Sequence, residues 1–230
     1  MVDQPDSSLA LRLAAVRSEI ADAASAAGRP VRDITTVVVT KFHPATLVRE
    51  LAGLGVRDVG ENRLQDAGPK AAQLEDLDLT WHFIGQLQSN KVRSVLEFSR
   101  IIHSVDRESL VESLARSESV PSIEVFIQLN LTDNEQRGGV RPDRLVELAE
   151  RVLAQPRLRL MGVMAVAPLG EEPRRSFERV RLVSESLRTI APEARALSMG
   201  MSGDFREAIL EGATHLRIGT AITGNRPDAG

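Results

Sequence analysis

Apolar residues recur along the chain in short β-branched or aliphatic runs, separated by amphipathic stretches of helical length. The clearest run spans 34–40, and its centre, Val37 to Val39, is typical of a strand buried on both faces. Further strands are predicted at 56–60, 80–85, 100–105, 123–130, 158–166, 196–200 and 215–219. The intervening spacing predicts helices at 44–54, 63–74, 90–97, 107–117, 141–154, 173–190 and 204–211. Strand and helix therefore alternate along the chain.

Eight short strands alternating with helices within about 200 residues predict a (β/α)8 TIM barrel of the α/β class. An open doubly wound sheet is the alternative, and the strand count and brevity favour the barrel. An extra alanine-rich amphipathic helix is predicted at 7–27, before the first strand. No linker or repeat divides the chain, so we expect a single domain over 1–230, with a frayed tail at 225–230.

Composition narrows the class of protein. Of the 230 residues, 42% are hydrophobic and 27% charged, which is ordinary for a soluble globular protein. The net charge of -3 provides no general attraction to nucleic acid or to an anionic membrane, and no apolar run reaches membrane-spanning length. The absence of cysteine excludes disulfides and thiolate chemistry. Together with a polar N-terminus unlike a signal peptide, this composition fits a cytoplasmic protein.

Lys41 stands at the carboxyl end of the first predicted strand, which is the end where TIM barrels form their active sites. The chain has only three lysines, Lys41, Lys70 and Lys91, and otherwise uses arginine as its cation. A lysine, unlike an arginine, can lose its proton and add to a carbonyl group. Lys41 is therefore either a Schiff-base lysine or a solvated residue that closes the strand.

Two later strand ends have the features of an anion site. The segment 199–204 follows the seventh strand and opens a helix, and Ser202 supplies a hydroxyl group there. Gly219 and Thr220 follow the eighth strand and offer backbone N–H groups. Phosphate sites in such barrels are often built from these last two loops. Arg217, two residues earlier, can face the barrel interior beside them.

A phosphate site near a Schiff-base lysine admits two classes of protein: a pyridoxal-phosphate protein, or a lysine aldolase acting on a sugar phosphate. Arg217 is compatible with both, because it can donate to a pyridine nitrogen or bind a second anionic group. The strand ends contain no cluster with metal-ligand spacing, so no metal is predicted. We interpret His82 and His103, which lie mid-strand, as hydrogen-bonded core residues.

Seven segments carry a resemblance to a known family, each weak alone but specific in their order and number. They are Val39 to Lys41, Gly60 to Gln65, Trp81 to Lys91, Ile102 to Asp106, Met161 to Met164, Leu197 to Asp204 and Gly212 to Thr220. Through them the chain resembles the pyridoxal phosphate homeostasis proteins over nearly its whole length. That family is similar in fold to the N-terminal barrel domain of alanine racemase, the fold type III of pyridoxal-phosphate proteins.

The resemblance implies that Lys41 forms a reversible Schiff base with the cofactor pyridoxal 5′-phosphate (PLP). The other implied contacts are Ser202, Gly219 and Thr220 at the phosphate, Arg217 at the pyridine nitrogen, and Asn62 near the cofactor. The chain departs from the family pattern at Phe42-His43, at Arg137 and at Thr223. These departures leave open the character of the surface around the opening of the cofactor site, and any partner that contacts it.

Two observations bear on activity. An arginine has donors only, so a pyridine nitrogen beside it stays unprotonated and the ring is a weak electron sink. The similar racemases use a tyrosine as a second base, and this chain contains no tyrosine. We therefore expect a monomeric carrier, not an enzyme, that buffers PLP or delivers it to apoenzymes. The alternatives are a racemase with an unusual second base, the lysine aldolase and a non-enzymatic scaffold.

Overall fold

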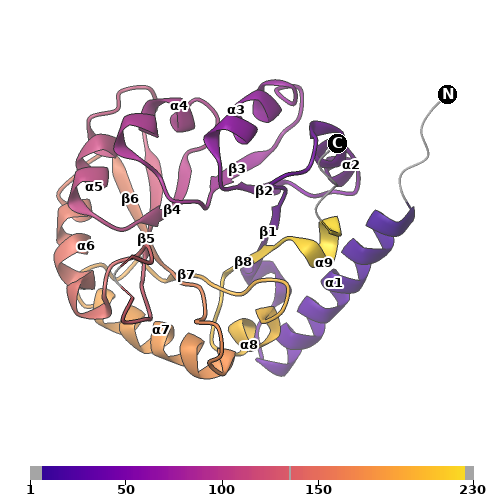
Figure 1. Cartoon of the computed structure of the whole chain (residues 1–230). Coiled ribbons are helices and arrows are strands. Elements are labelled where there is room, and N and C mark those ends of the chain that lie inside the picture. The colour runs from indigo at the N-terminus through magenta and orange to yellow at the C-terminus, as the bar shows by residue number, and fades with distance from the viewer. Residues whose placement is uncertain (1–6, 135, 226–230) are drawn as a thin grey trace.

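Eight parallel strands close into a barrel in the computed structural model of the protein, and the helices surround it (Figure 1). The structure describes residues 7–134 and 136–225. The strands are β1 (Thr35–Val39), β2 (Asp58–Glu61), β3 (Thr80–Phe83), β4 (Ile101–Val105), β5 (Ile123–Gln128), β6 (Leu158–Met164), β7 (Ala196–Ser198) and β8 (His215–Ile218). Each strand pairs with the next along the chain, and β8 pairs with β1. The predicted TIM barrel is confirmed.

Every predicted helix is present, and one helix was not predicted. The α-helices are α1 (Ser7–Ala26), α2 (Ala45–Gly53), α3 (Leu64–Ala72), α4 (Val92–Leu96), α5 (Glu108–Ala115), α6 (Leu145–Leu153), α7 (Pro173–Leu187), α8 (Phe205–Leu210) and α9 (Thr220–Thr223). Three 3-10 turns complete the set, η1 (Val31–Asp33), η2 (Ser89–Lys91) and η3 (Pro142–Arg144). The additional helix is α9, directly after β8. Of the tail expected to fray, only residue 225 is among the described residues.

Asp106 does not cap α5, although it directly precedes the helix predicted at 107–117. The sequence places Asp106 directly before a helix, where its carboxylate would accept from the first N–H groups. In the structure Arg107 is the N-cap residue of α5, without a side-chain cap hydrogen bond. The Asp106 carboxylate instead pairs with the Arg107 side chain at 2.7 Å and accepts from the Gly139 N–H at 3.3 Å. The Asp106 carboxylate therefore accepts a hydrogen bond from the distant loop that contains Gly139, and not from the first turn of α5.

Strand register decides which side chains share the barrel interior. Val37 is the partner of Arg217, and Val38 is the partner of Ile218. A Cβ added to Gly60 would contact the side chains of Val37 and Val39, so these two valines point inward. Because side chains alternate along a strand, the position of Lys41 continues this inward row at the carboxyl end of β1.

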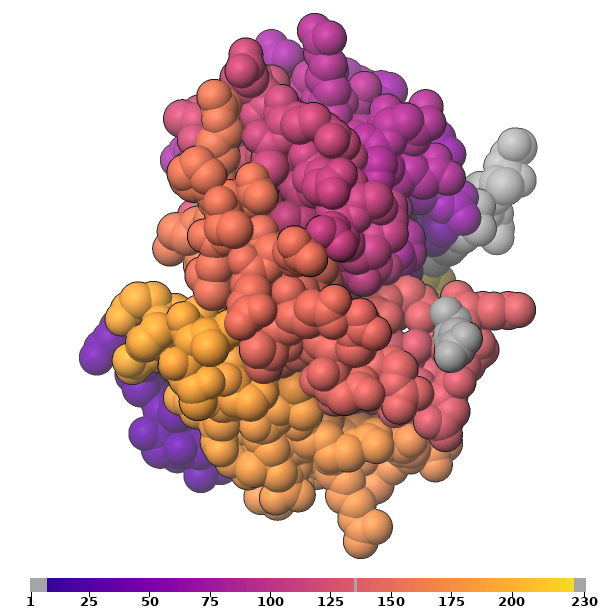
Figure 2. Space-filling view, turned by 90° about the vertical axis from the view of Figure 1, so that its left-hand side faces the viewer, coloured from indigo at the N-terminus to yellow at the C-terminus, as the bar shows by residue number. Residues whose placement is uncertain are grey.

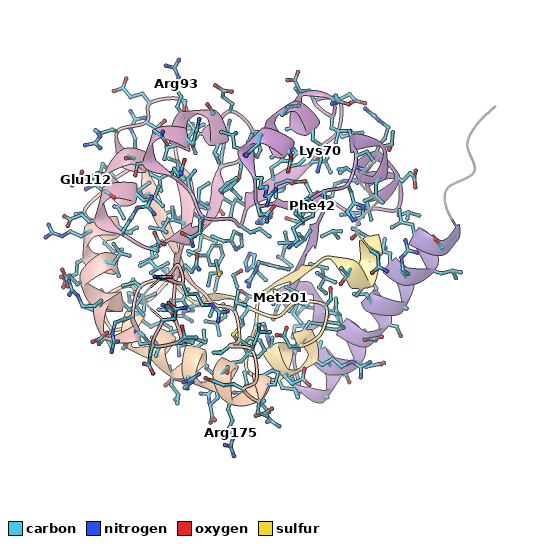
Figure 3. All side chains as sticks on the ribbon, viewed as in Figure 1. Phe42, Lys70, Arg93, Glu112, Arg175 and Met201 are labelled. Carbon is cyan, nitrogen blue, oxygen red and sulfur yellow. The ribbon has the colours of Figure 1, made fainter. Side chains whose placement is uncertain are left out.

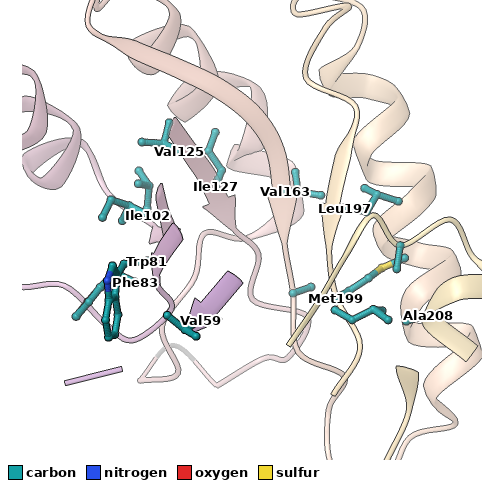
Figure 4. Close-up of a cluster of buried hydrophobic side chains, with 14 of the residues drawn as sticks. Val59, Trp81, Phe83, Ile102, Val125, Ile127, Val163, Leu197, Met199 and Ala208 are labelled. Carbon is teal, nitrogen blue, oxygen red and sulfur yellow. The ribbon is translucent and has the colours of Figure 1, made fainter. Parts of the chain in front are cut away.

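The main hydrophobic core lies between the strands and the surrounding helices (Figure 4). Outward-facing strand residues such as Val59, Ile102 and Val163 are fully buried there, against helix residues such as Phe177. In the space-filling view the outer wall runs from magenta at the top to orange at the bottom (Figure 2), so consecutive strand–helix units are neighbours. Among the described residues, no helix combines the length and apolarity needed to span a bilayer.

The N-terminal helix α1 packs across the outside of α8 and α9 (Figure 1). Its apolar stripe, which includes Leu9, Leu13 and Val16, is buried as the helical spacing predicts. Arg12 Nε donates to the Ile222 carbonyl of α9 at 2.7 Å. The first helix of the barrel therefore supports its last one.

Candidate functional site

Lys41 lies at the mouth of the barrel, two residues after the end of β1, and its side chain is exposed. Its Nζ is 5.9 Å from the centroid of the Phe42 ring, and the guanidinium carbon of Arg63 is 5.2 Å from the same ring. Phe42 has φ 68°, a conformation that is unfavourable for a bulky residue. In Figure 3, Phe42 and Met201 are labelled near the middle of the ring that the strands and helices form. Lys41 thus stands where a ligand in that mouth would meet it.

A buried ion pair holds the residue before Lys41. Lys70 Nζ, from α3, lies 2.5 Å from Glu61 Oε1 and donates to the Thr40 carbonyl at 2.9 Å. The Thr40 hydroxyl donates to the same Glu61 oxygen at 2.7 Å. These contacts fix the backbone at Thr40, just after the end of β1. Lys70 and Glu61 therefore set the direction in which the Lys41 side chain leaves the backbone.

Backbone and side-chain groups converge where the sequence predicts a phosphate site. The Ser202 hydroxyl accepts from the N–H groups of Gly219 at 3.3 Å and Ala221 at 3.2 Å. Thr220 lies between these two residues, begins α9 and has an exposed side chain. N–H groups in the first turn of a helix lack partners within the helix, and here those of Gly219 and Ala221 donate to the Ser202 hydroxyl, at a position where an anion could accept from them. Sequence reasoning missed Ala221, because its side chain gives no sign of the N–H group.

Arg217 lies two residues before Gly219 and is 4% exposed. Its Nη1 donates to the Ser198 hydroxyl at 2.7 Å, and its Nη2 donates to the Ala165 carbonyl at 2.9 Å. Burial lowers the pKa of Arg217 to about 10, against the attraction of Asp204. The guanidinium therefore stays charged at neutral pH.

Asn62 follows β2, the strand beside β1, and its Oδ1 atom is buried with no hydrogen-bond partner in the described structure. The backbone of Asn62 passes so close to Gly85 that a Cβ there would lie 2.1 Å from the Asn62 carbonyl oxygen. A cavity of about 620 Å³ opens beside this contact, and Asn62, Arg63 and Lys91 are among its lining residues. The exposed Lys91 therefore borders a cavity.

Together, the residues singled out from the sequence surround the carboxyl ends of four neighbouring strands, β7, β8, β1 and β2. The arrangement combines an amine at Lys41, hydrogen-bond donors for an anion around Ser202, and a buried cation at Arg217 between and below them. His82 and His103 are buried and hydrogen-bonded to each other at 2.9 Å, so their interpretation as core residues is confirmed. Within the described residues, no group of three or more His, Asp or Glu side chains is arranged to hold a metal ion.

Comparison with known proteins identifies the family. The family model described as alanine racemase, N-terminal domain, matches residues 11–227. A pyridoxal phosphate homeostasis protein of Pseudomonas aeruginosa is 43% identical over 225 residues, which cover 96% of each chain. The chain belongs to the pyridoxal phosphate homeostasis protein family. An Escherichia coli member is 40% identical over 226 residues, covering 95% of this chain and 97% of its own.

Solved structures give the same result. PipY of Synechococcus elongatus, determined with PLP bound, is 38% identical and superposes with a TM-score of 0.83 over 94% of this chain and 100% of its own. Alanine racemase from Corynebacterium glutamicum superposes with a TM-score of 0.68 at 17% identity, over 95% of this chain and 62% of its own. The racemase likeness concerns the fold alone, and the family assignment rests on the closer relatives.

Proposed function

We propose that this protein binds PLP reversibly, with Lys41 as the covalent anchor, and that it buffers the cofactor or delivers it without strong catalytic activity. The homeostasis proteins at about 40% identity and the PLP-bound PipY structure support this function. The proposal rests mainly on one observation of the site. Two backbone N–H groups converge on the Ser202 hydroxyl, above a buried arginine and beside β1, the strand that leads to Lys41.

The chemistry of the donors fits PLP part by part. The phosphate is a dianion, and the Ser202 hydroxyl with the N–H groups of Gly219 and Ala221 matches it without bulky side chains. A Cβ at Gly219 would be 3.6 Å from the Val39 Cβ, and Lys41 is the next inward position along that strand. The proposed phosphate site and Lys41 therefore follow two paired strands, β8 and β1. They are close enough for one small planar ligand to reach both. We assign Thr220 to the same phosphate.

Arg217 and Asn62 complete the proposed site. Arg217 lies one inward position deeper than Gly219, where it can donate to the pyridine nitrogen of a ligand held by its phosphate. Asn62 Oδ1, buried without a partner, can accept from a donor on the cofactor or on the amine that enters with it. Both residues orient the ring, and neither supplies an acid or base.

The residues also favour binding over turnover. PLP supplies an electron sink when bound, and its strength depends on protonation of the ring nitrogen. Arg217 can only donate, so it keeps that nitrogen unprotonated. A racemase would also need a second base opposite the lysine, and the chain has no tyrosine for that role. A carrier requires only that the cofactor bind and leave.

The first experiment is an absorption spectrum of the purified protein before and after borohydride reduction, with peptide mapping of the reduced product. We expect a visible band that borohydride removes and a pyridoxyl group on Lys41. Lys91→Ala is the matched control, because Lys91 is also exposed, and it should leave labelling unchanged. A colourless protein labelled only when a sugar phosphate is added would indicate the aldolase, and labelling of another lysine would refute the proposal.

A second experiment separates carrier from enzyme. Amino acids incubated with the loaded protein in deuterated water should show no steady α-proton exchange, whereas exchange that Lys41→Ala abolishes would indicate a racemase.

We further propose that the carrier is a monomer and that it donates PLP to apoenzymes in transient contacts. Sizing by light scattering tests the first point. The second point is tested by the activation rate of a PLP-requiring apoenzyme. The loaded protein should activate it faster than free PLP does, when free PLP is supplied at the concentration that the loaded protein maintains.

A further inference from the structure

A continuous chain of polar side chains crosses the interior of the barrel below the proposed cofactor site. Arg217 Nη1 lies 2.7 Å from Ser198 Oγ, and Ser198 Oγ lies 2.8 Å from His103 Nδ1. His103 Nε2 lies 2.9 Å from His82 Nδ1, and His82 Nε2 lies 3.0 Å from Asp58 Oδ1. The five residues come from β8, β7, β4, β3 and β2. Arg217, Ser198 and both histidines are buried, whereas the Asp58 side chain is 32% exposed.

Donor and acceptor chemistry sets the direction of the first half of this chain. An arginine can only donate, so Ser198 Oγ accepts from Arg217. The single Ser198 hydroxyl proton must then point to His103 Nδ1, because Ser198 has no other acceptor among its hydrogen bonds in the described structure. A buried hydroxyl pointing elsewhere would leave its proton unsatisfied. His103 Nδ1 is therefore unprotonated.

The second half follows from the first. With Nδ1 as an acceptor, His103 carries its proton on Nε2 and donates to His82 Nδ1. His82 then carries its own proton on Nε2 and donates it to the Asp58 carboxylate. Every hydrogen bond points the same way, from Arg217 to Asp58, and both imidazoles are neutral. Burial, followed by the nearby His82 and Arg217, holds the pKa of His103 well below its usual value, in agreement with this direction.

The remaining groups that face the chain do not reverse it. The His215 ring lies 6.3 Å from the His82 ring and 6.1 Å from the His103 ring, and its Nδ1 is hydrogen-bonded to the Thr214 hydroxyl at 2.8 Å. Phe126 stacks on His103 with the ring centroids 4.4 Å apart. Asp204 attracts Arg217 from the other side. None of these contacts offers the imidazoles a competing acceptor.

We propose that Ser198, His103, His82 and Asp58 are positioning residues that hold Arg217 through one directed hydrogen-bond relay. Its charges lie only at the two ends, a guanidinium below the cofactor site and a carboxylate toward the opposite, amino-terminal end of the barrel. Because each member can donate in one direction only, the relay fixes the Arg217 guanidinium in place. The role of Arg217 toward PLP rests on the proposed function, whereas the direction of the relay does not.

The direct test is long-range ¹H–¹⁵N NMR of histidine side chains in the full chain, with and without PLP, near neutral pH. The chain has four histidines, so the spectrum is simple. We expect His82 and His103 to be neutral and to carry their protons on Nε2 in both samples. A proton on Nδ1 of either residue, or a doubly protonated ring, would overturn the relay. This result does not depend on cofactor binding.

Variants then connect the relay to the cofactor. Ser198→Ala removes the hydroxyl that joins Arg217 to His103, so we expect mixed tautomers at His103 and PLP dissociation faster by about tenfold to a hundredfold. Ser198→Thr keeps the hydroxyl and should restore both the tautomer and the retention of PLP. Unchanged tautomers and retention in Ser198→Ala would contradict the proposal.

The far end of the relay offers a second pair. Asp58→Asn keeps an acceptor oxygen for His82, whereas Asp58→Leu removes it; both should leave the His82 proton on Nε2, because His103 still donates to His82 Nδ1. A His82 proton on Nδ1 in either variant would contradict the relay, even if Ser198 variants fail to fold. If borohydride does not label Lys41 but the tautomers are as expected, the proposed function fails and the relay stands. The reverse result refutes the relay alone.

Discussion

Lys70 Nζ lies 2.5 Å from Glu61 Oε1 in an ion pair whose two side chains are 6% and 0% exposed, directly beneath the residue that precedes Lys41. Breaking one partner of such a buried pair leaves an uncompensated charge, which typically costs about 3–5 kcal/mol. We predict that Lys70→Met lowers the free energy of unfolding by about that amount. It should also loosen PLP, because the Thr40 carbonyl loses its donor. Urea unfolding and cofactor dissociation rates provide the two measurements.

The double variant Glu61→Gln with Lys70→Met is the control for that prediction. It removes both charges, so it should be more stable than Lys70→Met alone. If the two substitutions proved additive, the ion pair would have no coupling energy. The orientation of Lys41 would then depend on other contacts.

Ser202→Ala should weaken PLP retention without abolishing it. A hydrogen bond to a charged group contributes about 1.5–3 kcal/mol, which corresponds to roughly a tenfold to hundredfold loss of affinity. The N–H groups of Gly219 and Ala221 remain in the variant, so most of the phosphate site survives. Equilibrium titration with PLP measures the change. Ser113→Ala, on an exposed turn of α5, is the matched control. No loss, or a loss far beyond a hundredfold, would show that the phosphate lies elsewhere.

Two glycines of the loop that carries Ser202 should respond differently to alanine. Gly200 has φ +92°, and a Cβ there would lie 2.7 Å from the Ala208 Cβ, so Gly200→Ala should destabilise the fold by about 1–3 kcal/mol. A Cβ at Gly203 would meet nothing within 4 Å. Gly203→Ala should therefore stay within about 0.5 kcal/mol of the parent. Thermal or urea unfolding of the pair checks the contrast, which equal effects would refute.

Stability should fall as the pH is lowered below 6.5. Burial, followed by the nearby His82, lowers the pKa of His215 from 6.5 to about 4. In the unfolded chain this histidine regains its ordinary pKa, so between these values the unfolded state binds more protons and acid favours unfolding. The contribution of His215 is present above pH 6.5 and is lost as the pH falls toward 4, a change of at most about 3 kcal/mol. His103 acts in the same direction.

Urea unfolding between pH 7 and pH 4.5 measures this dependence. His215→Gln should flatten the curve, because glutamine does not titrate. His43 is also buried and burial lowers its pKa in the same direction, so His43→Gln should flatten the curve as well. A parent protein whose stability is constant or rises over this range would contradict the neutral state of the interior histidines.

The fold and the location of the site could be predicted because both depend on local patterns. The valines at 37–39 mark a buried strand from their own side chains, and strand ends follow once the strands are known. Lys41, Ser202 and Gly219 needed only their position relative to a strand end. The strands nevertheless stop earlier than predicted, as at 199–200, where Gly200 turns the chain with a positive φ.

What could not be predicted depends on partners distant in sequence. Lys70 gives no sign of burial in the sequence, because only the folded barrel brings it to its partner Glu61 at the end of β2. Asp106 has the position of a helix cap, yet its carboxylate accepts a hydrogen bond from the N–H group of Gly139, 33 residues away. His82 and His103 were identified as core residues, but their alignment with Ser198 and Arg217 requires the closed ring of strands.

Closure of the barrel between β8 and β1 has a consequence for protein synthesis. Lys41 leaves the ribosome early, yet the N–H groups that the proposed phosphate site needs belong to residues 219 and 221, and Arg217 is made just before them. A nascent chain that ends before β8 therefore has the reactive amine without the groups that would retain PLP. If the protein has the proposed function, PLP is therefore bound only after synthesis is complete, and a product truncated before β8 does not retain PLP.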